Sequence, residues 1–259
     1  MRHHVVGCGR WGTWLARRLQ SRTRRLASLC NRTGDIAQRL AQELHVAARP
    51  WQNWSSGLAR EDCVWLTLSD DALPSAHAAL ARDGCRSMVL QASGAAPLNP
   101  APYPTGVVWP LMSISAVREP AWSSLTCVVE AGGAARYERL AELTEASIEP
   151  ARILRADSGL RARLHLGAVL TQNFTNLLWD LAADQLPADT LQLLVPLASA
   201  HLEAIRAGTP PADLQTGPAV RGDVASMERH ERLLQDHDQA LAVYRMMSGV
   251  IASRSKETI

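Results

Sequence analysis

Three glycines follow the spacing G-x-G-x-x-G in the segment Val5-Val6-Gly7-Cys8-Gly9-Arg10-Trp11-Gly12. This spacing occurs in many proteins, and a plain glycine-rich turn is the alternative interpretation. Here the apolar residues 3–6 predict a strand directly before the glycines, and residues 11–20 predict a helix directly after them. A strand, this glycine pattern and a helix in that order are typical of folds that bind dinucleotides.

Glycine is required at each of the three positions of such a turn for a different physical reason. Gly7 permits the tight turn, Gly9 lets a pyrophosphate approach the backbone, and Gly12 lets the helix pack closely on the strand. The first N–H groups of a helix have no partner within the helix, so those of Arg10 and Trp11 are expected to face the phosphates. The segment therefore predicts a cofactor site at the start of the chain.

Short apolar segments alternate with helical patterns through the first 150 residues. Further strands are predicted at residues 26–30, 63–68, 87–91, 106–109 and 125–130, and further helices at 34–44, 72–81 and 137–144. This alternation predicts an α/β domain with a parallel sheet covered by helices on both faces. Beyond it only helices are predicted, at residues 160–183, 190–207 and 224–252. We expect a dinucleotide-binding domain over residues 1–152 and an all-helical domain over residues 153–259.

The residues after the second predicted strand indicate which nicotinamide cofactor is bound. A site for NAD carries an acidic residue there, which bonds the ribose 2′-hydroxyl, but this sequence has Asn31. Arg32 follows and offers a planar, permanently charged donor for a 2′-phosphate. Asn31 and Thr33 can donate further hydrogen bonds. We therefore predict NADP as the cofactor; the alternative is a surface arginine beside a helix cap.

Polar residues also follow two later strands. Ligands in open α/β sheets lie beyond the carboxyl ends of the strands, so Ser69 and Asp70 are candidates to line the cofactor ribose. Equally, Asp70 can cap the helix that follows. Ser93, after the next strand, is a candidate polar group near the nicotinamide.

Two segments of the helical domain have unusual polar content. At about 100° per residue, one face of the first helix carries several polar groups, namely His165, Gln172, Asn173 and Asn176. They are typical either of the wall of a site or of a buried hydrogen-bond network between helices. In the second segment, residues 216–223, Arg221 is suited to a substrate carboxylate or to pairing with Asp223, which is placed to cap the next helix.

These segments together resemble the Rossmann-like proteins with a C-terminal domain of unknown function 2520 (DUF2520). Those proteins are relatives of 6-phosphogluconate dehydrogenase, ketopantoate reductase and pyrroline-5-carboxylate reductase. The resemblance rests on residues 7–12, 31–33, 69–71, 93–94, 110–111, 165–176 and 216–223. It implies an NADP-dependent oxidoreductase with its active site in a cleft between the domains, a 6-phosphogluconate dehydrogenase-like helical domain, and a homodimer built through the helical domains.

The sequence departs from these relatives at three positions that matter for proton transfer. Gln91 and Trp109 stand where the group usually has histidines, and Val169 stands where related β-hydroxyacid dehydrogenases have a lysine. His165 then remains as the candidate general acid or base, since histidine changes its charge near neutral pH. Asn173 is expected to orient the reacting oxygen or nitrogen.

We therefore expect hydride transfer to or from a C=O or C=N carbon of a small molecule. Ser93 adds a hydrogen bond, Trp109 forms an apolar wall, and Gln172 and Arg221 are candidates for substrate binding. The missing lysine and histidines support a second interpretation, a protein that binds NADP as a sensor or scaffold without turnover. NADPH oxidation with keto acids and cyclic imines distinguishes the two.

Composition excludes several other classes of function. Lysine plus arginine is 27 and aspartate plus glutamate is 25, and a net charge of +2 gives no general reason to bind nucleic acid or an anionic membrane. No segment approaches the roughly 20 apolar residues of a membrane helix, and no signal segment is recognised, so we expect a cytoplasmic protein. The five cysteines lack C-x-x-C spacing, which favours small buried residues over disulfides or a metal site.

Overall fold

The computed structural model describes residues 1–114 and 121–257. Contacts within the chain divide it into two compact units, Met1–Phe174 and Thr175–Ile259. The boundary predicted from the sequence, after residue 152, falls inside the last strand, β8 (Arg152–Arg155). The division by contacts falls further along the chain, inside a helix. Each unit is described by itself.

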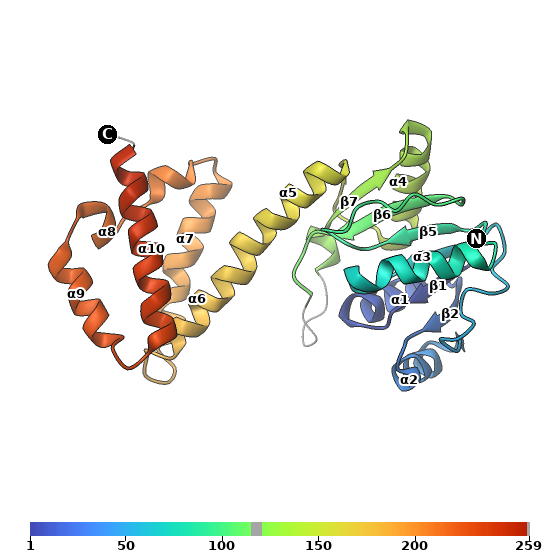
Figure 1. Ribbon diagram of the computed structural model, residues 1–259, viewed down its shortest axis with the longest axis horizontal. Helices are drawn as coiled ribbons and strands as arrows, with labels where there is room; N and C mark the ends of the chain where they lie inside the picture. The colour runs from blue at the N-terminus through green and yellow to red at the C-terminus, as the bar shows by residue number, and fades with distance from the viewer. Residues whose placement is uncertain (115–120, 258–259) are drawn as a thin grey trace. The chain divides into compact units, whose positions relative to one another are not determined.

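The first unit contains one eight-stranded sheet, with strand order β3-β2-β1-β4-β5-β6-β7-β8 (Figure 1). The strands are β1 (His3–Val6), β2 (Leu26–Cys30), β3 (Ala47–Ala48), β4 (Cys63–Leu66), β5 (Met88–Gln91), β6 (Thr105–Pro110), β7 (Thr126–Ala131) and β8 (Arg152–Arg155). The central strand β4 reads Cys-Val-Trp-Leu and is buried at all four of its positions, as a sheet covered on both faces requires.

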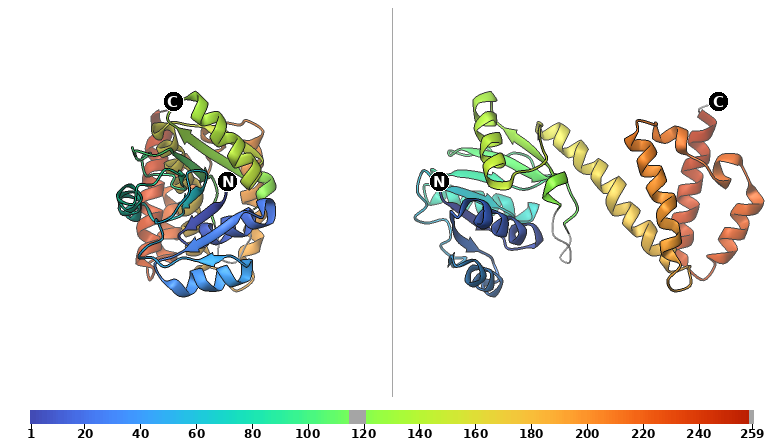
Figure 2. Two further views of the ribbon diagram at one scale, coloured as in Figure 1. Left: turned by 90° about the vertical axis from the view of Figure 1, so that its right-hand side faces the viewer. Right: turned by 180° about the vertical axis from the view of Figure 1, so that it is seen from behind.

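Helices cover both faces of this sheet. They are α1 (Arg10–Thr23), α2 (Gly34–Leu44), α3 (Leu73–Arg82), α4 (Ala134–Ile148) and α5 (Ser158–Ala168). Successive side chains of a strand point to opposite faces, so Val5 packs in one core with α1, α2 and α4, while Val6 packs in another with α3. Leu160 and Leu164 of α5 pack with Trp109 in a third cluster. The two faces can be followed in Figures 1 and 2, where α3 (teal) and α4 (light green) lie on opposite sides of the sheet.

The sheet differs from the prediction in one pairing and two strands. Every neighbouring pair is parallel except β6 and β7, which are antiparallel, so the prediction of an entirely parallel sheet is wrong at that point. Parallel neighbours need a crossover, usually a helix, and the described residues between β6 and β7 hold only the short 3₁₀ turn η2 (Trp122–Ser124). The edge strands β3 and β8 were not predicted, since β3 has two residues and β8 reads Arg-Ile-Leu-Arg.

The second unit is helical in its described part, as predicted. After the π-helical turn η3 (Val169–Asn173) come α6 (Phe174–Ala183), η4 (Leu191–Leu194), α7 (Val195–Arg206), η5 (Pro211–Leu214), α8 (Pro218–Arg221), α9 (Val224–Leu233) and α10 (Asp238–Glu257). They follow one another from yellow to red in Figure 2. The cap predicted at Asp223 is confirmed, because its carboxylate accepts a hydrogen bond from the N–H of Ser226 at 3.0 Å.

The single helix predicted over residues 224–252 is wrong, because a turn separates α9 from α10. Leu234 ends α9 with N–H bonds back to His230 and Glu231, and the carbonyl of His237 accepts the first bond of α10 from Leu241 at 2.9 Å. Asp238 then occupies the first turn of α10, where a carboxylate favours the positive end of the helix dipole. The apolar spacing continues across this turn, so periodicity alone does not reveal it.

A buried Ser-His-Asp cluster lies at the amino ends of the strands. His4 Nδ1 lies 2.7 Å from Ser28 Oγ, and His4 Nε2 lies 3.2 Å from Asp62 Oδ2. The three residues are only 4% (Ser28), 7% (His4) and 1% (Asp62) exposed, so a substrate has no access to the serine hydroxyl. Burial also lowers the pKa of the neighbouring His3 to about 4, so this ring is neutral and accepts a bond from Trp65 Nε1 at 3.1 Å. The cluster is therefore structural.

Candidate functional site

The glycine turn lies where the direction of strand order reverses. From β1 the chain proceeds to β2 on one side, while β4 pairs with β1 on the other. Thr67, directly after β4, donates its N–H to the carbonyl of Val6 at 2.9 Å and its hydroxyl to the carbonyl of Gly7. In open α/β sheets such a reversal leaves a crevice at the carboxyl ends of the strands, which is where ligands bind.

The three glycines divide into two that pack and one that faces open space. Gly7 has φ = +102°, and a Cβ on Gly12 would lie 1.8 Å from the carbonyl oxygen of Gly7, so neither position accepts a side chain. A Cβ on Gly9 would meet nothing within 4 Å. Gly9 is the N-cap of α1 and supplies no side-chain cap, which leaves the N–H groups of the first turn for a ligand. The turn thus has both the space and the donors that a pyrophosphate needs.

The end of β2 is joined to this turn by a hydrogen bond. Asn31 Oδ1 accepts from the N–H of Cys8 at 2.9 Å, and Asn31 Nδ2 donates to Thr33 Oγ1 at 2.8 Å. The amide of Asn31 therefore stabilises the glycine turn, a role that the sequence alone does not predict. Arg32 is exposed and has no carboxylate partner among the described residues.

Ser69 and Asp70 follow β4 at the same edge of the sheet. Neither side chain caps a helix: Ser69 is the N-cap of the 3₁₀ turn η1 (Asp70–Ala72) without a side-chain hydrogen bond, and α3 begins after Ala72, also without one. The capping alternative for Asp70 is therefore wrong. Its exposed carboxylate is available to a ligand, and a ribose contact stays a prediction.

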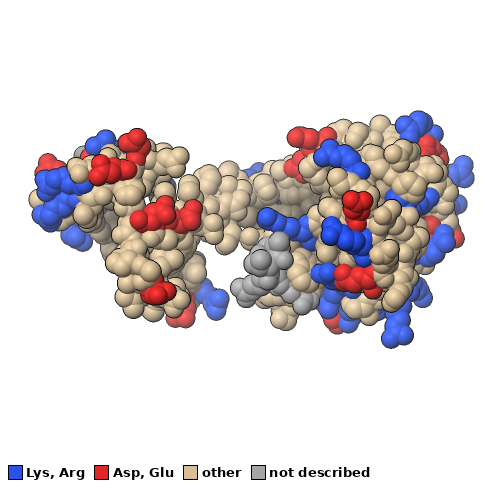
Figure 3. Space-filling view, turned by 90° about the horizontal axis from the view of Figure 1, so that it is seen from below, with Lys and Arg blue, Asp and Glu red and all other residues tan. Residues whose placement is uncertain are grey.

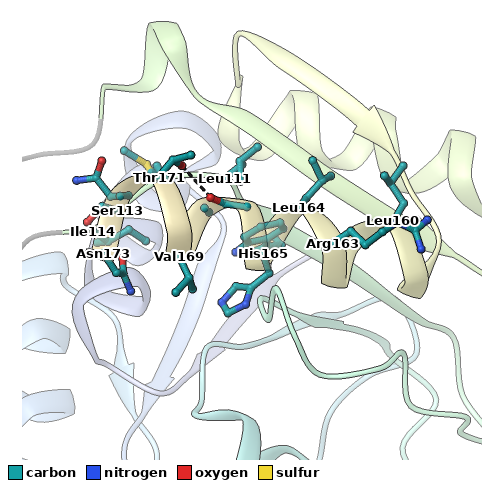
Figure 4. A pocket seen from close by; sticks show the side chains of 15 residues that line it. Leu111, Ser113, Ile114, Leu160, Arg163, Leu164, His165, Val169, Thr171 and Asn173 are labelled. Carbon is teal, nitrogen blue, oxygen red and sulfur yellow. Dashed lines mark hydrogen bonds between the residues drawn. The ribbon is translucent and has the colours of Figure 1, made fainter. Parts of the chain in front are cut away.

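A cavity of about 770 Å³ lies within the first unit, between the end of β6 and the helix that begins with α5 (Figure 4). Four predicted residues, Trp109, His165, Gln172 and Asn173, line it. The other lining residues are Leu111, Met112, Ser113, Ile114, Leu160, Arg163, Leu164, Gly167, Ala168, Val169 and Thr171. The wall is thus largely apolar with a few polar groups, which is typical of a small-molecule site.

Figure 4 shows His165, Val169 and Asn173 on one side of the helix and Leu160 and Leu164 on the other. The two leucines pack with Trp109, and residues from both sides of the helix line the cavity. The predicted stripe is interrupted at η3, where the helix widens to a π turn. Such turns are common at functional sites, and single-sequence periodicity does not predict them.

His165 is held against the sheet by close packing. Its ring centroid lies 5.7 Å from that of Trp109, with the planes tilted by 57°. A Cβ on Gly94 would lie 2.6 Å from both His165 Cδ2 and Trp109 Cε2, so only glycine fits between the two rings. Gly94 follows β5 and Trp109 lies on β6, which is parallel to β5. His165 therefore lies at the sheet edge that carries the glycine turn.

A buried ion pair fixes α5 one turn before His165. Arg161 is fully buried and donates Nε to Glu130 Oε2 at 2.9 Å, and its Nη1 donates to the carbonyl of Ser93 at 2.9 Å. Ser158 Oγ donates to the other oxygen of Glu130 at 2.5 Å. Each group has several hydrogen bonds, which a buried charge requires. The sequence alone does not predict this role, because nothing in the residues around Arg161 distinguishes it from the exposed arginines.

Ser93 is buried outside this cavity lining. Its hydroxyl oxygen accepts hydrogen bonds from the N–H groups of Ala95, at 3.2 Å, and Ala96, at 2.8 Å, and so braces the turn after β5. Arg221 lies in the second unit, at the end of α8, and Asp223 bonds Ser226 rather than Arg221. Catalytic or binding roles for Ser93 and Arg221 stay predictions.

Three further findings concern the described residues. They contain no group of three or more His, Cys, Asp or Glu side chains placed to hold a metal ion. No helix among them combines the length and apolar character needed to cross a membrane. All five cysteines are buried, as predicted, and burial raises the pKa of Cys8, beside the glycine turn, to about 12, so this thiol is not a reactive thiolate.

Part of the chain matches a protein family, and the whole chain is similar to proteins of known structure. Residues 125–251 match the family model described as "Domain of unknown function (DUF2520)". The crystal structure of a "putative NADP oxidoreductase" from Bacteroides fragilis is 26% identical with a TM-score of 0.82, covering 97% of this chain and 98% of that one. No curated protein matches the chain in sequence.

Two liganded enzymes share the fold at lower identity. An imine reductase from Myxococcus stipitatus in complex with NADP+ is 16% identical, with a TM-score of 0.67 and coverage of 99% of this chain and 95% of that one. A reductive aminase from Aspergillus terreus in complex with NADPH and ethyl-5-oxohexanoate is 14% identical, with a TM-score of 0.70 and coverage of 99% and 94%.

The mostly parallel sheet, with its glycine turn at the reversal of strand order and helices after it, defines a Rossmann-like fold with a helical C-terminal part, as predicted. The match over residues 125–251 identifies a DUF2520 domain in this part of the chain, as the resemblance implied.

Proposed function

We propose that this protein is an NADP(H)-dependent oxidoreductase that transfers a hydride to or from a C=O or C=N carbon of a small molecule. The observation that carries the proposal is the turn at Gly9, which faces open space at the start of α1 with Arg32 beside it at the end of β2. The likeness to the Bacteroides fragilis protein over nearly the whole chain supports the same conclusion.

In this proposal the bound cofactor supplies or accepts the hydride, and the chain binds, orients and exchanges the proton. When a C=O or C=N group is reduced, its carbon gains the hydride and its oxygen or nitrogen gains a proton. His165 lines the cavity and is the proposed proton donor. Asn173, on the same side of the helix, is proposed to orient the reacting oxygen or nitrogen through its amide (Figure 4). Trp109 and Gln172 are proposed to contact the substrate.

One observation favours the second candidate, an NADP-binding sensor or scaffold without turnover. Val169 lines the cavity where related dehydrogenases carry a lysine, so His165 is the only histidine or lysine in the described lining. NADPH binding without oxidation across a panel of keto acids and cyclic imines would favour this candidate over the enzyme.

The first prediction concerns the choice of cofactor. We expect wild-type protein to bind NADP+ more tightly than NAD+, and Arg32→Ala to weaken NADP+ binding by about 10- to 100-fold, since charged hydrogen bonds contribute roughly 1.5–3 kcal/mol each. NAD+ affinity should remain unchanged in the variant. Titration calorimetry measures all four affinities, and equal affinities for the two cofactors in wild-type protein would refute the preference.

We also propose a homodimer through the helical part of the chain. Among the residues whose burial the structure describes, all but one of the exposed large apolar side chains lie between Leu166 and Val250, the exception being Ile36. Contiguous apolar surface on a soluble chain marks an interaction site. Figure 3 shows positive and negative side chains interspersed over the drawn face of each unit.

The second prediction tests this interface. Leu197 is 73% exposed, and Leu197→Glu should convert a dimer into a monomer by placing a charge in an apolar interface. Ile36→Glu is the matched control and should leave the mass unchanged. Sedimentation equilibrium measures both, and a wild-type chain that is monomeric at micromolar concentration contradicts the dimer.

A further inference from the structure

A small cavity of about 270 Å³ lies beside the end of β2, and it is lined by Arg32 together with residues to which no function has been given so far. Three segments line it: the residues after β2, the first two turns of α2, and residues 48–52, which begin at the last residue of β3. Its lining residues are Asn31, Arg32, Gly34, Ala37, Gln38, Ala48, Arg49, Pro50, Trp51 and Gln52. It therefore adjoins the position where an NADP ribose is proposed to lie.

Two positive charges and no negative charge line this cavity. Arg32 and Arg49 both contribute to its wall, and neither forms an ion pair with a carboxylate in the part of the chain that the structure describes. Asp35, on the first turn of α2, is absent from the lining. Two like charges facing one small space repel each other, so an anion placed between them is stabilised by both.

The backbone explains why Arg49 lies beside Arg32. In the register of β2 with β3, Leu29 pairs with Ala48, and the N–H of Arg49 donates to the carbonyl of Leu29 at 2.8 Å. Position 49 is therefore fixed beside the last residue of β2, directly before Asn31 and Arg32. The guanidinium of Arg49 donates from Nη2 to the carbonyl of Ser56, which leaves its other N–H groups for a ligand.

We propose that Arg49 is a second phosphate-binding residue, which holds the ribose 2′-phosphate of NADP from the side opposite Arg32. This inference rests on the proposed function. A guanidinium matches a phosphate with two parallel N–H donors, and two of them approaching from different segments fix its position as well as its charge. Arg49 is a specificity residue, because it contacts the one group that distinguishes NADP from NAD.

The test uses ligands that differ only in this phosphate. Binding of NADP+ and NAD+, and of adenosine 2′,5′-bisphosphate and 5′-AMP, is measured by calorimetry for wild-type protein and Arg49→Gln. Glutamine keeps a donor for the Ser56 carbonyl but removes the charge. We expect Arg49→Gln to weaken NADP+ and the bisphosphate about 10-fold or more and to leave NAD+ and 5′-AMP within about two-fold. Arg49→Lys should recover part of the loss.

Arg39→Gln is the matched control, because Arg39 is an exposed arginine on α2 that is not among the residues lining the cavity. Thermal unfolding by circular dichroism shows that each variant is folded. If wild-type protein binds NADP+ and Arg49→Gln keeps the wild-type ratio of NADP+ to NAD+ affinity, this inference is overturned and the proposed function stands. If wild-type protein binds neither NADP+ nor the bisphosphate, both are overturned.

Discussion

Gly9→Val is expected to weaken NADPH binding by about 100-fold or more while leaving the protein folded. A Cβ at Gly9 meets no atom within 4 Å, and its φ of −69° and ψ of −168° are extended values that valine readily adopts. The new side chain fills the space proposed for the pyrophosphate and blocks the N–H groups of the first turn of α1. Losing two charged hydrogen bonds of roughly 1.5–3 kcal/mol each weakens binding by about 100-fold or more.

Gly12→Ala is the matched comparison within the same motif. Its Cβ would lie 1.8 Å from the Gly7 carbonyl oxygen, so here the backbone itself must move and the unfolding temperature should fall. Calorimetry with NADPH and thermal unfolding of both variants separate a binding effect from a folding effect. A Gly9→Val protein that binds NADPH with wild-type affinity would show that the phosphates do not lie over this residue.

His165→Ala is expected to reduce turnover far more than cofactor affinity. Proton transfer by a positioned side chain contributes about 10²- to 10⁴-fold to the rate, so kcat should fall by at least 100-fold while the Kd for NADPH changes less than about three-fold. The histidine lies against Trp109 in the wall of the cavity, whereas the proposed cofactor contacts lie at the ends of β1 and β2. The measurement is NADPH oxidation with the best substrate from a panel of keto acids and cyclic imines.

Two companion variants sharpen this result. His45→Asn, at the exposed end of α2, should leave kcat unchanged, and asparagine suits its left-handed φ of 54°. Gly94→Ala should lower kcat without removing the imidazole, because its Cβ would displace the rings of His165 and Trp109. Unchanged turnover in His165→Ala would exclude this residue from the chemistry.

The sequence predicts the parts of the fold that depend on local pattern. Alternation of apolar strands and amphipathic helices gives the α/β class, and the glycine spacing gives the turn after β1. The antiparallel pairing of β6 with β7 depends instead on what connects them, and the edge strand β3 is too short for a periodic signal. The break between α9 and α10 is not predicted, because the same apolar spacing continues on both sides of it.

For the candidate site, local pattern identifies His165, Asn173 and Trp109, which line one cavity. It does not identify the groups that position them. Gly94 is revealed only by the two rings packed against it, and Arg161 only by its buried contacts with Glu130 and the carbonyl of Ser93. The proposed role of Arg49 likewise becomes apparent only from the pairing of β2 with β3, which places Arg49 in the wall of the same cavity as Arg32. Contacts between distant segments, rather than residue types, define these roles.

If the first unit holds NADP(H) over the glycine turn, calorimetric titration of wild-type protein with NADPH should show saturable binding of one NADPH per chain, with a lower affinity for NADH. A flat titration from protein that unfolds cooperatively, and is therefore intact, would show that the glycine turn does not hold this cofactor.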